Sequence, residues 1–190
     1  DLITEALYNQ ALRPRIRADI VTEFLAKRQR LAEGYVPESP EEWAEWLKER
    51  VLLPAAELPE DADLPDEAVW IEQDGRRWLT HLELVHGLRA SNFVPTAPEA
   101  PVVEDQRDAV QLAREILSFY GPLSDDEIAA LLPTVPEDLL VEDELFIHGV
   151  LLEDDDRVLW CDAENFEALM RFQRAAQRAE LEPQPAERLP

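Results

Sequence analysis

The stretch LSDDEIAALLPTVPEDLLVEDELFIHGV, residues 123–150, contains the signals that decide the fold of the C-terminal half. Ser124 precedes an apolar run and Glu127 follows three residues later, which is the pattern of a capping box at a helix N-terminus. Pro133 ends that helix, because proline cannot continue an α-helical ladder. A second, acidic helix is expected over residues 135–144, and the apolar residues that close the stretch are typical of a β-strand.

The flanking residues complete an order of elements. The residues before the stretch have the apolar spacing of an amphipathic helix. Residues 145–161 predict two strands joined by an acidic turn at Asp154–Arg157, and Asp162 is placed to cap a long final helix. Helix, helix, helix, two-stranded wing and helix is the order of a winged helix-turn-helix domain. We expect this winged helix over residues 107–181, followed by a loose tail over 182–190.

The expected third helix has an unusual charge for its position. It stands where a winged helix carries its DNA-recognition helix, yet it has five carboxylates and no basic residue (Glu137, Asp138, Glu142, Asp143 and Glu144). The leucines Leu139, Leu140 and Leu145 could pack this element on the core and leave its acids outward. We therefore expect a helix that does not enter a DNA groove and that faces solvent or a basic partner.

The N-terminal half has helix and hairpin signals. Ser39 and Glu42 form another capping-box pattern, and Gly34 is placed as the C-terminal cap of the preceding helix. Asp74-Gly75 between two β-rich arms predicts a tight hairpin turn. The expected elements are helices over 2–12, 14–33 and 39–53, an acidic linker over 54–67, a hairpin over 68–81, and a short helix or irregular turn over 81–89.

The best candidate for a domain boundary is a proline-rich segment. Residues 93–106 contain Pro95, Pro98 and Pro101 and predict an extended linker. Residues 1–92 are then a helical segment plus a hairpin, which could form a partial winged helix. The fold class expected is mainly α with small β-hairpins (α+β), arranged as tandem winged-helix-like modules.

Charge limits the partners of this chain. The formal net charge is −24. Residues 1–34 carry six basic and five acidic residues, residues 35–106 carry five and 17, and residues 107–190 carry seven and 20. Because binding to DNA phosphates depends on Lys and Arg, most of the chain should be repelled by nucleic acid. Such acidity suits a basic partner.

Three local arginine clusters are the candidate nucleic-acid contacts. One lies at the N-terminal helices, one follows the hairpin turn, and one repeats at helical spacing on the final helix. The alternative is that each cluster is a solvated face that complements a helix dipole. The residues are Arg13, Arg15 and Arg17, then Arg76 and Arg77, then Arg171, Arg174 and Arg178.

Motifs of catalysis are missing from the sequence. There is no GxxxxGK[ST] phosphate loop and no GxGxxG, so ATP binding by a P-loop is excluded for this chain. A Cys161–His148 pair across the wing is conceivable, but no third group orients it. The acidic runs Glu142–Glu144 and Asp154–Asp156 lack EF-hand spacing, so no metal site is expected. Whether the chain contributes to an enzyme stays open.

Compartment signals are few. The single cysteine fits a reducing cytoplasm, and neither a signal peptide nor an apolar run of membrane-spanning length is visible. The only methionine is Met170, which indicates a fragment of a longer protein or a trimmed chain. A cytoplasmic protein with no membrane partner is expected.

The C-terminal half resembles the C-terminal region of bacterial large helicase-related (Lhr) proteins. The similar segments are LAREILSFYGPLSDDEIAALL (112–132), LFIHGVLL (145–152) and LWCDAENFEALMRFQRAAQR (159–178). The hairpin sequence AVWIEQDGRRWLT and the segment from Phe24 to Pro54 also look similar to members of that family. The similarity covers about two-thirds of the chain loosely.

This resemblance implies a longer parent protein. Lhr proteins are superfamily 2 DNA helicases linked to DNA repair, whose ATP and Mg²⁺ bind to RecA-like domains that this chain does not include. Their C-terminal region stacks winged helices, looks like a family of DNA glycosylases, and is implicated in homo-oligomerisation. No motif here identifies a glycosylase carboxylate, so the resemblance assigns no catalytic residue to the chain.

The expected function is a non-catalytic winged-helix module of such a helicase, shaping assembly and DNA engagement. Two alternatives stay open. One is an acidic protein-interaction adaptor or a mimic of nucleic-acid charge, and the other is part of a glycosylase-like site. The expected partners are other domains of the same chain, DNA through the arginine clusters, or a basic protein.

Overall fold

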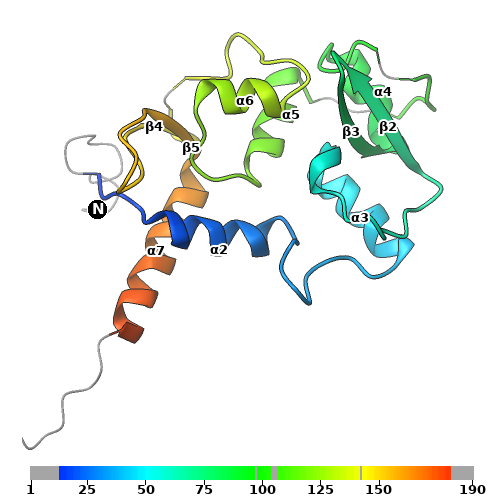
Figure 1. Cartoon of the computed structure of the whole chain (residues 1–190). Coiled ribbons are helices and arrows are strands. Elements are labelled where there is room, and N and C mark those ends of the chain that lie inside the picture. Colours follow the sequence, from blue (N-terminus) through cyan, green and yellow to red (C-terminus); the bar gives the residue numbers. More distant parts are fainter. Residues whose placement is uncertain (1–12, 97, 104–106, 142, 181–190) are drawn as a thin grey trace, which may run out of the picture.

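The computed structural model is an α+β fold, as the sequence predicts (Figure 1). It describes residues 13–96, 98–103, 107–141 and 143–180, and for 179 and 180 the backbone only. The expected helix over 2–12 and the tail over 182–190 therefore lie outside the described residues. The helices are α2 Ala18–Arg28, α3 Pro40–Arg50, α4 Leu82–Ala90, α5 Ala109–Leu117, α6 Asp125–Leu131 and α7 Ala163–Glu180, with a 3-10 turn η1 Ala55–Glu57. The strands are β1 Leu53–Pro54, β2 Ala68–Gln73, β3 Arg76–His81, β4 Phe146–Gly149 and β5 Leu159–Asp162.

The first sheet is built around the predicted hairpin. Strands β2 and β3 are antiparallel, and Gln73 pairs with Arg76 across the two-residue turn. Asp74 and Gly75 both have positive φ angles, 52° and 75°, as a tight primed turn requires. The short strand β1 adds to the other edge of β3, which gives the order β1-β3-β2. Helix α4 follows β3 directly, so this unit is a helix, a small sheet and a helix.

The second sheet is the predicted wing. Strands β4 and β5 are antiparallel, with Phe146 opposite Asp162 and Gly149 opposite Leu159. Asp162 caps α7, because its carboxylate accepts a hydrogen bond from the Asn165 backbone N–H at 2.9 Å. The capping box of α6 is also confirmed, with Ser124 and Glu127 in reciprocal contact. Local caps therefore set the boundaries of the C-terminal elements.

The expected third helix is absent. Residues 135–141 form turns, bends and irregular backbone. Leu139 is buried in the core as expected, whereas Leu145, which was expected to pack on the core as well, is 55% exposed. Pro136 disfavours helical backbone at the residue before it, and Asp143 accepts the Leu145 and Phe146 backbone N–H groups at 2.8 and 2.9 Å. Few residues remain between these two stops, too few to offset the cost of helix nucleation. The prediction of a helix over 135–144 was wrong for the residues that the structure describes.

The helix that follows Pro14 is shorter than expected. Helix α2 ends at Arg28 with Gln29 as its C-cap, and Arg30 has a positive φ angle of 54°. Gly34 also has a positive φ angle, 78°, but it lies in the following turn. Gly34 is therefore not the helix cap that the sequence predicts.

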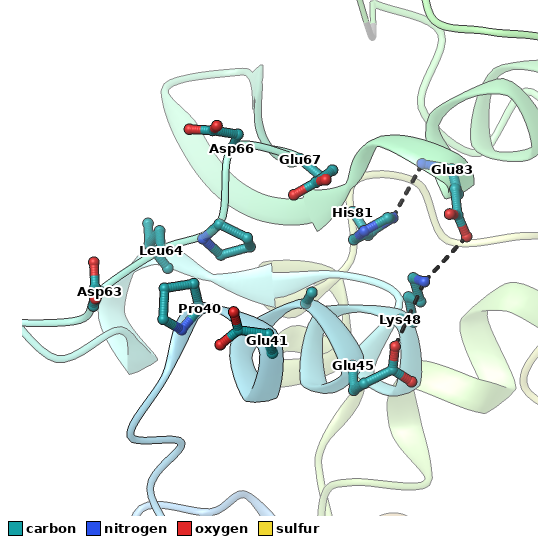
Figure 2. Close-up of a pocket in the computed structure, with 12 residues that line it drawn as sticks. Pro40, Glu41, Glu45, Lys48, Asp63, Leu64, Asp66, Glu67, His81 and Glu83 are labelled. Carbon is teal, nitrogen blue, oxygen red and sulfur yellow. Dashed lines mark hydrogen bonds and ion pairs between the residues drawn. The ribbon is translucent and has the colours of Figure 1, made fainter.

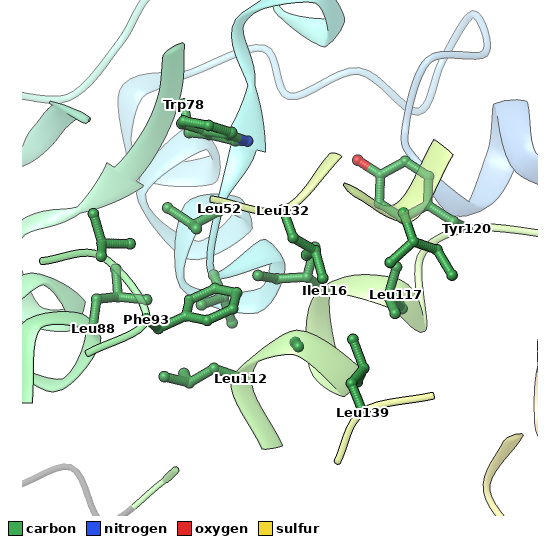
Figure 3. Close-up of a cluster of buried hydrophobic side chains, with 14 of the residues drawn as sticks. Leu52, Trp78, Leu88, Phe93, Leu112, Ile116, Leu117, Tyr120, Leu132 and Leu139 are labelled. Carbon is green, nitrogen blue, oxygen red and sulfur yellow. The ribbon is translucent and has the colours of Figure 1, made fainter. Parts of the chain in front are cut away.

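Three hydrophobic clusters hold the fold together. The largest joins β2, β3 and α4 to α5, α6 and the start of the wing (Figure 3). Phe93 and Val94, in the segment expected as a linker, are fully buried in it. A second cluster packs α2 against β4, β5 and α7, and a third packs α3 on the first sheet. Buried contacts thus run from the N-terminal to the C-terminal half.

Candidate functional site

A buried polar cluster links the two halves. Arg50, on α3, is completely buried, and its Nη2 donates to Glu57 Oε2 and to the Tyr120 hydroxyl oxygen, both at 2.6 Å. The Tyr120 hydroxyl donates to Glu57 Oε1 at 2.5 Å. Burial raises the pKa of Tyr120 far above its usual value, so the phenol stays neutral and can donate. We call Arg50, Glu57 and Tyr120 the buried triad.

The surroundings of the buried triad indicate that it stabilises the fold and does not bind a substrate. The Arg50 guanidinium lies over the rings of Phe119 and Tyr120, at 4.9 and 5.0 Å from their centroids. Its Nε and Nη1 have no hydrogen-bond partner among the residues that the structure describes. Burial this deep excludes a substrate. Sequence reasoning did not single out Arg50, although its spacing after Trp43 and Trp46 puts it on the apolar face of α3.

Arg76 does not lie at a free wing tip. Its Nη1 donates to the carbonyl oxygens of Ala129, Ala130 and Leu132, at 2.6, 3.0 and 3.1 Å. Trp78 Nε1 donates to the Leu131 carbonyl at 2.8 Å. The last carbonyls of a helix lack partners within the helix. Side chains of β3 therefore supply the C-terminal cap of α6, and Arg76 joins the two halves of the molecule.

Replacing Arg76 with methionine should lower the free energy of unfolding by about 1–3 kcal/mol, because several carbonyls lose a charged donor. The matched control is Arg77→Met. Arg77 pairs with Glu72 at 2.8 Å, and both side chains are at least half exposed. That change should cost no more than about 1 kcal/mol. Urea unfolding compares the two, and equal losses would contradict the capping role of Arg76.

Arg13, Arg15 and Arg17 lie against the wing. Arg13 is buried, and its Nη1 donates to the His148 carbonyl at 2.6 Å. Arg15 pairs with Asp156 at 3.1 Å, and Arg17 pairs with Asp19 at 2.5 Å. The backbone N–H of Ile16 donates to the Leu151 carbonyl at 2.8 Å. The Gln173 side chain accepts from the Arg17 N–H and donates to the Arg15 carbonyl. The first arginine cluster fastens the chain to the wing and to α7.

The arginines of α7 are the most open of the three clusters. Arg171, Arg174 and Arg178 are all exposed. Arg171 lies 3.7 Å from Glu167, and Arg174 Nε donates to the Met170 carbonyl at 3.1 Å. No carboxylate within ion-pair distance of Arg174 or Arg178 is found among the described residues. This face of α7 keeps a basic surface.

The conceivable Cys161–His148 pair does not form. In the wing register, Ile147 lies opposite Cys161 and His148 lies opposite Trp160. Because side chains alternate between the faces of a strand, Cys161 and His148 point to opposite faces. His148 stacks on Trp160 with ring centroids 4.0 Å apart. Burial also raises the pKa of the Cys161 thiol, so no reactive thiolate is available.

Acidic side chains of the 135–145 region have mixed roles. Asp143 pairs with Arg114 at 2.7 Å, which ties this segment to α5. Burial alone would raise the pKa of Asp143, but the hydrogen bonds from Arg114 and from two backbone N–H groups lower it overall. Glu137 and Asp138 have no ion-pair partner in the part of the chain that the structure describes. No group of three or more His, Cys, Asp or Glu side chains among the described residues could hold a metal ion.

A concave surface lies beside α3 and the first sheet (Figure 2). This cleft has a volume of about 660 Å³. We call it the acidic cleft, because six carboxylates and one ammonium line it, together with a histidine and a few apolar residues. Its residues are Pro40, Glu41, Ala44, Glu45, Lys48, Asp63, Leu64, Pro65, Asp66, Glu67, His81 and Glu83.

His81 gives the acidic cleft a defined donor. Only 3% of the residue is exposed, and its Nδ1 accepts the Glu83 backbone N–H at 3.2 Å, which caps α4. Burial lowers the pKa of His81, and the nearby Lys48 ammonium lowers it further. A neutral imidazole whose Nδ1 accepts must carry its proton on Nε2. The sequence placed His81 at the hairpin end but gave no sign of this burial.

The pKa of His81 predicts a stability change in mild acid. The folded pKa is lowered, so the unfolded chain takes up a proton first as pH falls, and stability is lost from about pH 7 toward pH 5.5. His81→Asn should remove this part of the loss, since its Oδ1 can replace Nδ1 as the cap. Urea unfolding at both pH values measures it. An equal decline in the variant and the native chain would contradict the prediction.

Compared with models of known protein families and with curated proteins, the sequence has no significant match. In the described part of the chain, no helix combines the length and apolar character needed to cross a bilayer. The candidate sites therefore rest on the geometry of the chain itself.

Proposed function

We propose that the chain is a non-catalytic module from the C-terminal region of a large ATP-dependent DNA helicase linked to repair, and that it shapes assembly. The resemblance to the Lhr C-terminal region motivates the choice of parent. The observation that carries the assembly role is the position of Arg76, which caps α6 with three hydrogen bonds instead of extending from a wing tip. An arginine used in this way is not available to a phosphate.

The rest of the charge distribution supports the same role. Arg15, Arg17 and Arg77 are paired with carboxylates, and the expected recognition segment is acidic and not helical. The Cys161 thiol and the triad around Arg50 are buried, so neither of them is accessible to a substrate. Apart from the basic face of α7, much of the accessible surface is acidic and includes the acidic cleft, which suits a basic protein partner.

The isolated chain should bind duplex DNA only weakly. At about 0.15 M salt, fluorescence anisotropy with a labelled duplex should give a Kd no tighter than about 10⁻⁶ M, the range of non-specific binding. A nanomolar Kd would contradict the proposal. In the full-length protein, deleting residues 13–180 should change the oligomeric state measured by sedimentation velocity. An unchanged oligomeric state would count equally against an assembly role.

A second role, in DNA engagement, is favoured by the open face of α7. Arg171, Arg174 and Arg178 could contact phosphates once neighbouring domains hold DNA nearby. Replacing all three with glutamine in the full-length protein should then weaken DNA binding and reduce its salt dependence by up to about three counterions. An unchanged salt dependence would remove this role.

A further inference from the structure

We propose that the acidic cleft binds a lysine- or arginine-rich peptide segment of an assembly partner. This inference rests on the assembly role proposed above and adds the place and the chemistry of the contact. Two independent features of the cleft indicate the same kind of ligand: four carboxylates without an ion-pair partner among the described residues, and the unused Nε2–H donor of His81.

The first feature is negative charge without compensation. Lys48 is held between Glu45 and Glu83, at 3.6 and 3.3 Å. The other four carboxylates of the cleft have no ion-pair partner among the described residues (Glu41, Asp63, Asp66 and Glu67). The Lys48 contacts demonstrate that an ammonium group fits between carboxylates of this cleft. The remaining carboxylates could accept further cations in the same way.

The second feature is the unused donor of His81. The imidazole is buried, faces the cleft between Glu67 and Lys48 in Figure 2, and uses only Nδ1 within the chain. Its Nε2–H has no acceptor among the described residues. The Nε2–H can therefore donate to a ligand oxygen that enters the cleft beside His81. The cleft is therefore suited to a ligand that carries a hydrogen-bond acceptor as well as positive charge.

These two requirements together select a peptide. A metal ion or a polyamine supplies positive charge but no acceptor for the His81 Nε2–H. DNA supplies acceptors, but its phosphates would be repelled by the carboxylates. A peptide offers a backbone carbonyl beside a Lys or Arg side chain. The apolar residues Pro40, Ala44 and Leu64 supply a surface for the aliphatic stem of that side chain.

The test uses the whole chain and a fluorescein-labelled peptide in which lysine alternates with glycine. Anisotropy at about 0.05 M salt should show binding that weakens at about 0.5 M salt. A peptide with glutamine in place of lysine should not bind. Unlabelled spermine should compete much less well than an unlabelled copy of the lysine peptide. Equal competition at matched charge would overturn the choice of a peptide.

Variants locate the binding site. Asp66→Asn with Glu67→Gln should weaken binding by about tenfold, through loss of ion pairing. His81→Asn keeps an N-cap but removes the Nε2–H, and should weaken binding about fivefold, as loss of one hydrogen bond implies. The matched control, Glu137→Gln with Asp138→Asn, makes the same change in net charge outside the cleft and should have little effect. Circular dichroism verifies that each variant is folded.

The outcomes separate this inference from the proposed function. No peptide binding, or equal weakening by the control and the cleft variants, overturns the cleft as a docking site and leaves the assembly role standing. Tight DNA binding by the isolated chain overturns the assembly role, whatever the peptide does. If the cleft variants lose affinity for the peptide and the control variant does not, the result supports both the docking site and the assembly role.

Discussion

Replacing Arg50 with methionine should lower the free energy of unfolding by about 3–5 kcal/mol, the usual cost of breaking a buried ion pair. Methionine keeps much of the volume of the arginine stem, so the loss reports mainly on charge and hydrogen bonding. Glu57 and Tyr120 would lose the Arg50 Nη2 group that donates to both of them at 2.6 Å. Urea unfolding followed by tryptophan fluorescence measures the change.

The control for Arg50 is Arg30, because both guanidinium groups lie over the ring of Trp46, at 5.6 Å and 4.2 Å from its centroid. Arg30 pairs with Glu49 at 3.1 Å near the surface. Arg30→Met should therefore cost no more than about 1 kcal/mol. Adding Glu57→Leu to Arg50→Met should recover part of the loss, because no uncompensated carboxylate remains. A loss below about 1 kcal/mol for Arg50→Met alone would show that the buried triad does not stabilise the fold.

The sequence predicted the elements whose signals are local. The Asp74-Gly75 turn, the Ser124–Glu127 capping box and the Asp162 cap each depend on residues within a few positions, and all three are confirmed. The helix expected over 135–144 failed for a local reason too. There the periodic leucines were outweighed by Pro136 and by the side chain of Asp143, which takes backbone donors that a helix would use.

The functional assignments of the arginines could not be made from the sequence. Arg76 bonds carbonyls 53–56 positions away, and Arg50 bonds Tyr120 at a separation of 70. Nothing in the residues next to Arg76 distinguishes it from Arg77, which is exposed beside Glu72. A run of basic residues indicates a phosphate contact only when the chain elsewhere offers no acceptor, and that depends on tertiary packing.

The burial of Phe93, in the expected linker over 93–106, likewise depends on tertiary packing and could not be predicted from the neighbouring residues. The Phe93 side chain is completely buried in the core, next to Leu88 and Leu112 in Figure 3. The Val94 N–H donates to the Leu88 carbonyl at 3.0 Å, which turns the chain back against α4 after Asn92 at a positive φ of 56°. Three prolines dominate the composition of this segment, so its two buried residues give no signal beside them.

Phe93→Ala should lower the free energy of unfolding by about 3–5 kcal/mol, as for other buried aromatic residues. Val102→Ala is the control in the same segment, since Val102 is 78% exposed and should change stability by no more than about 0.5 kcal/mol. Fluorescence and circular dichroism should give one coincident urea transition, because the largest cluster joins both halves. Two separate transitions, or a loss below about 1 kcal/mol for Phe93→Ala, would mean that residues 93–106 act as a linker between independent domains.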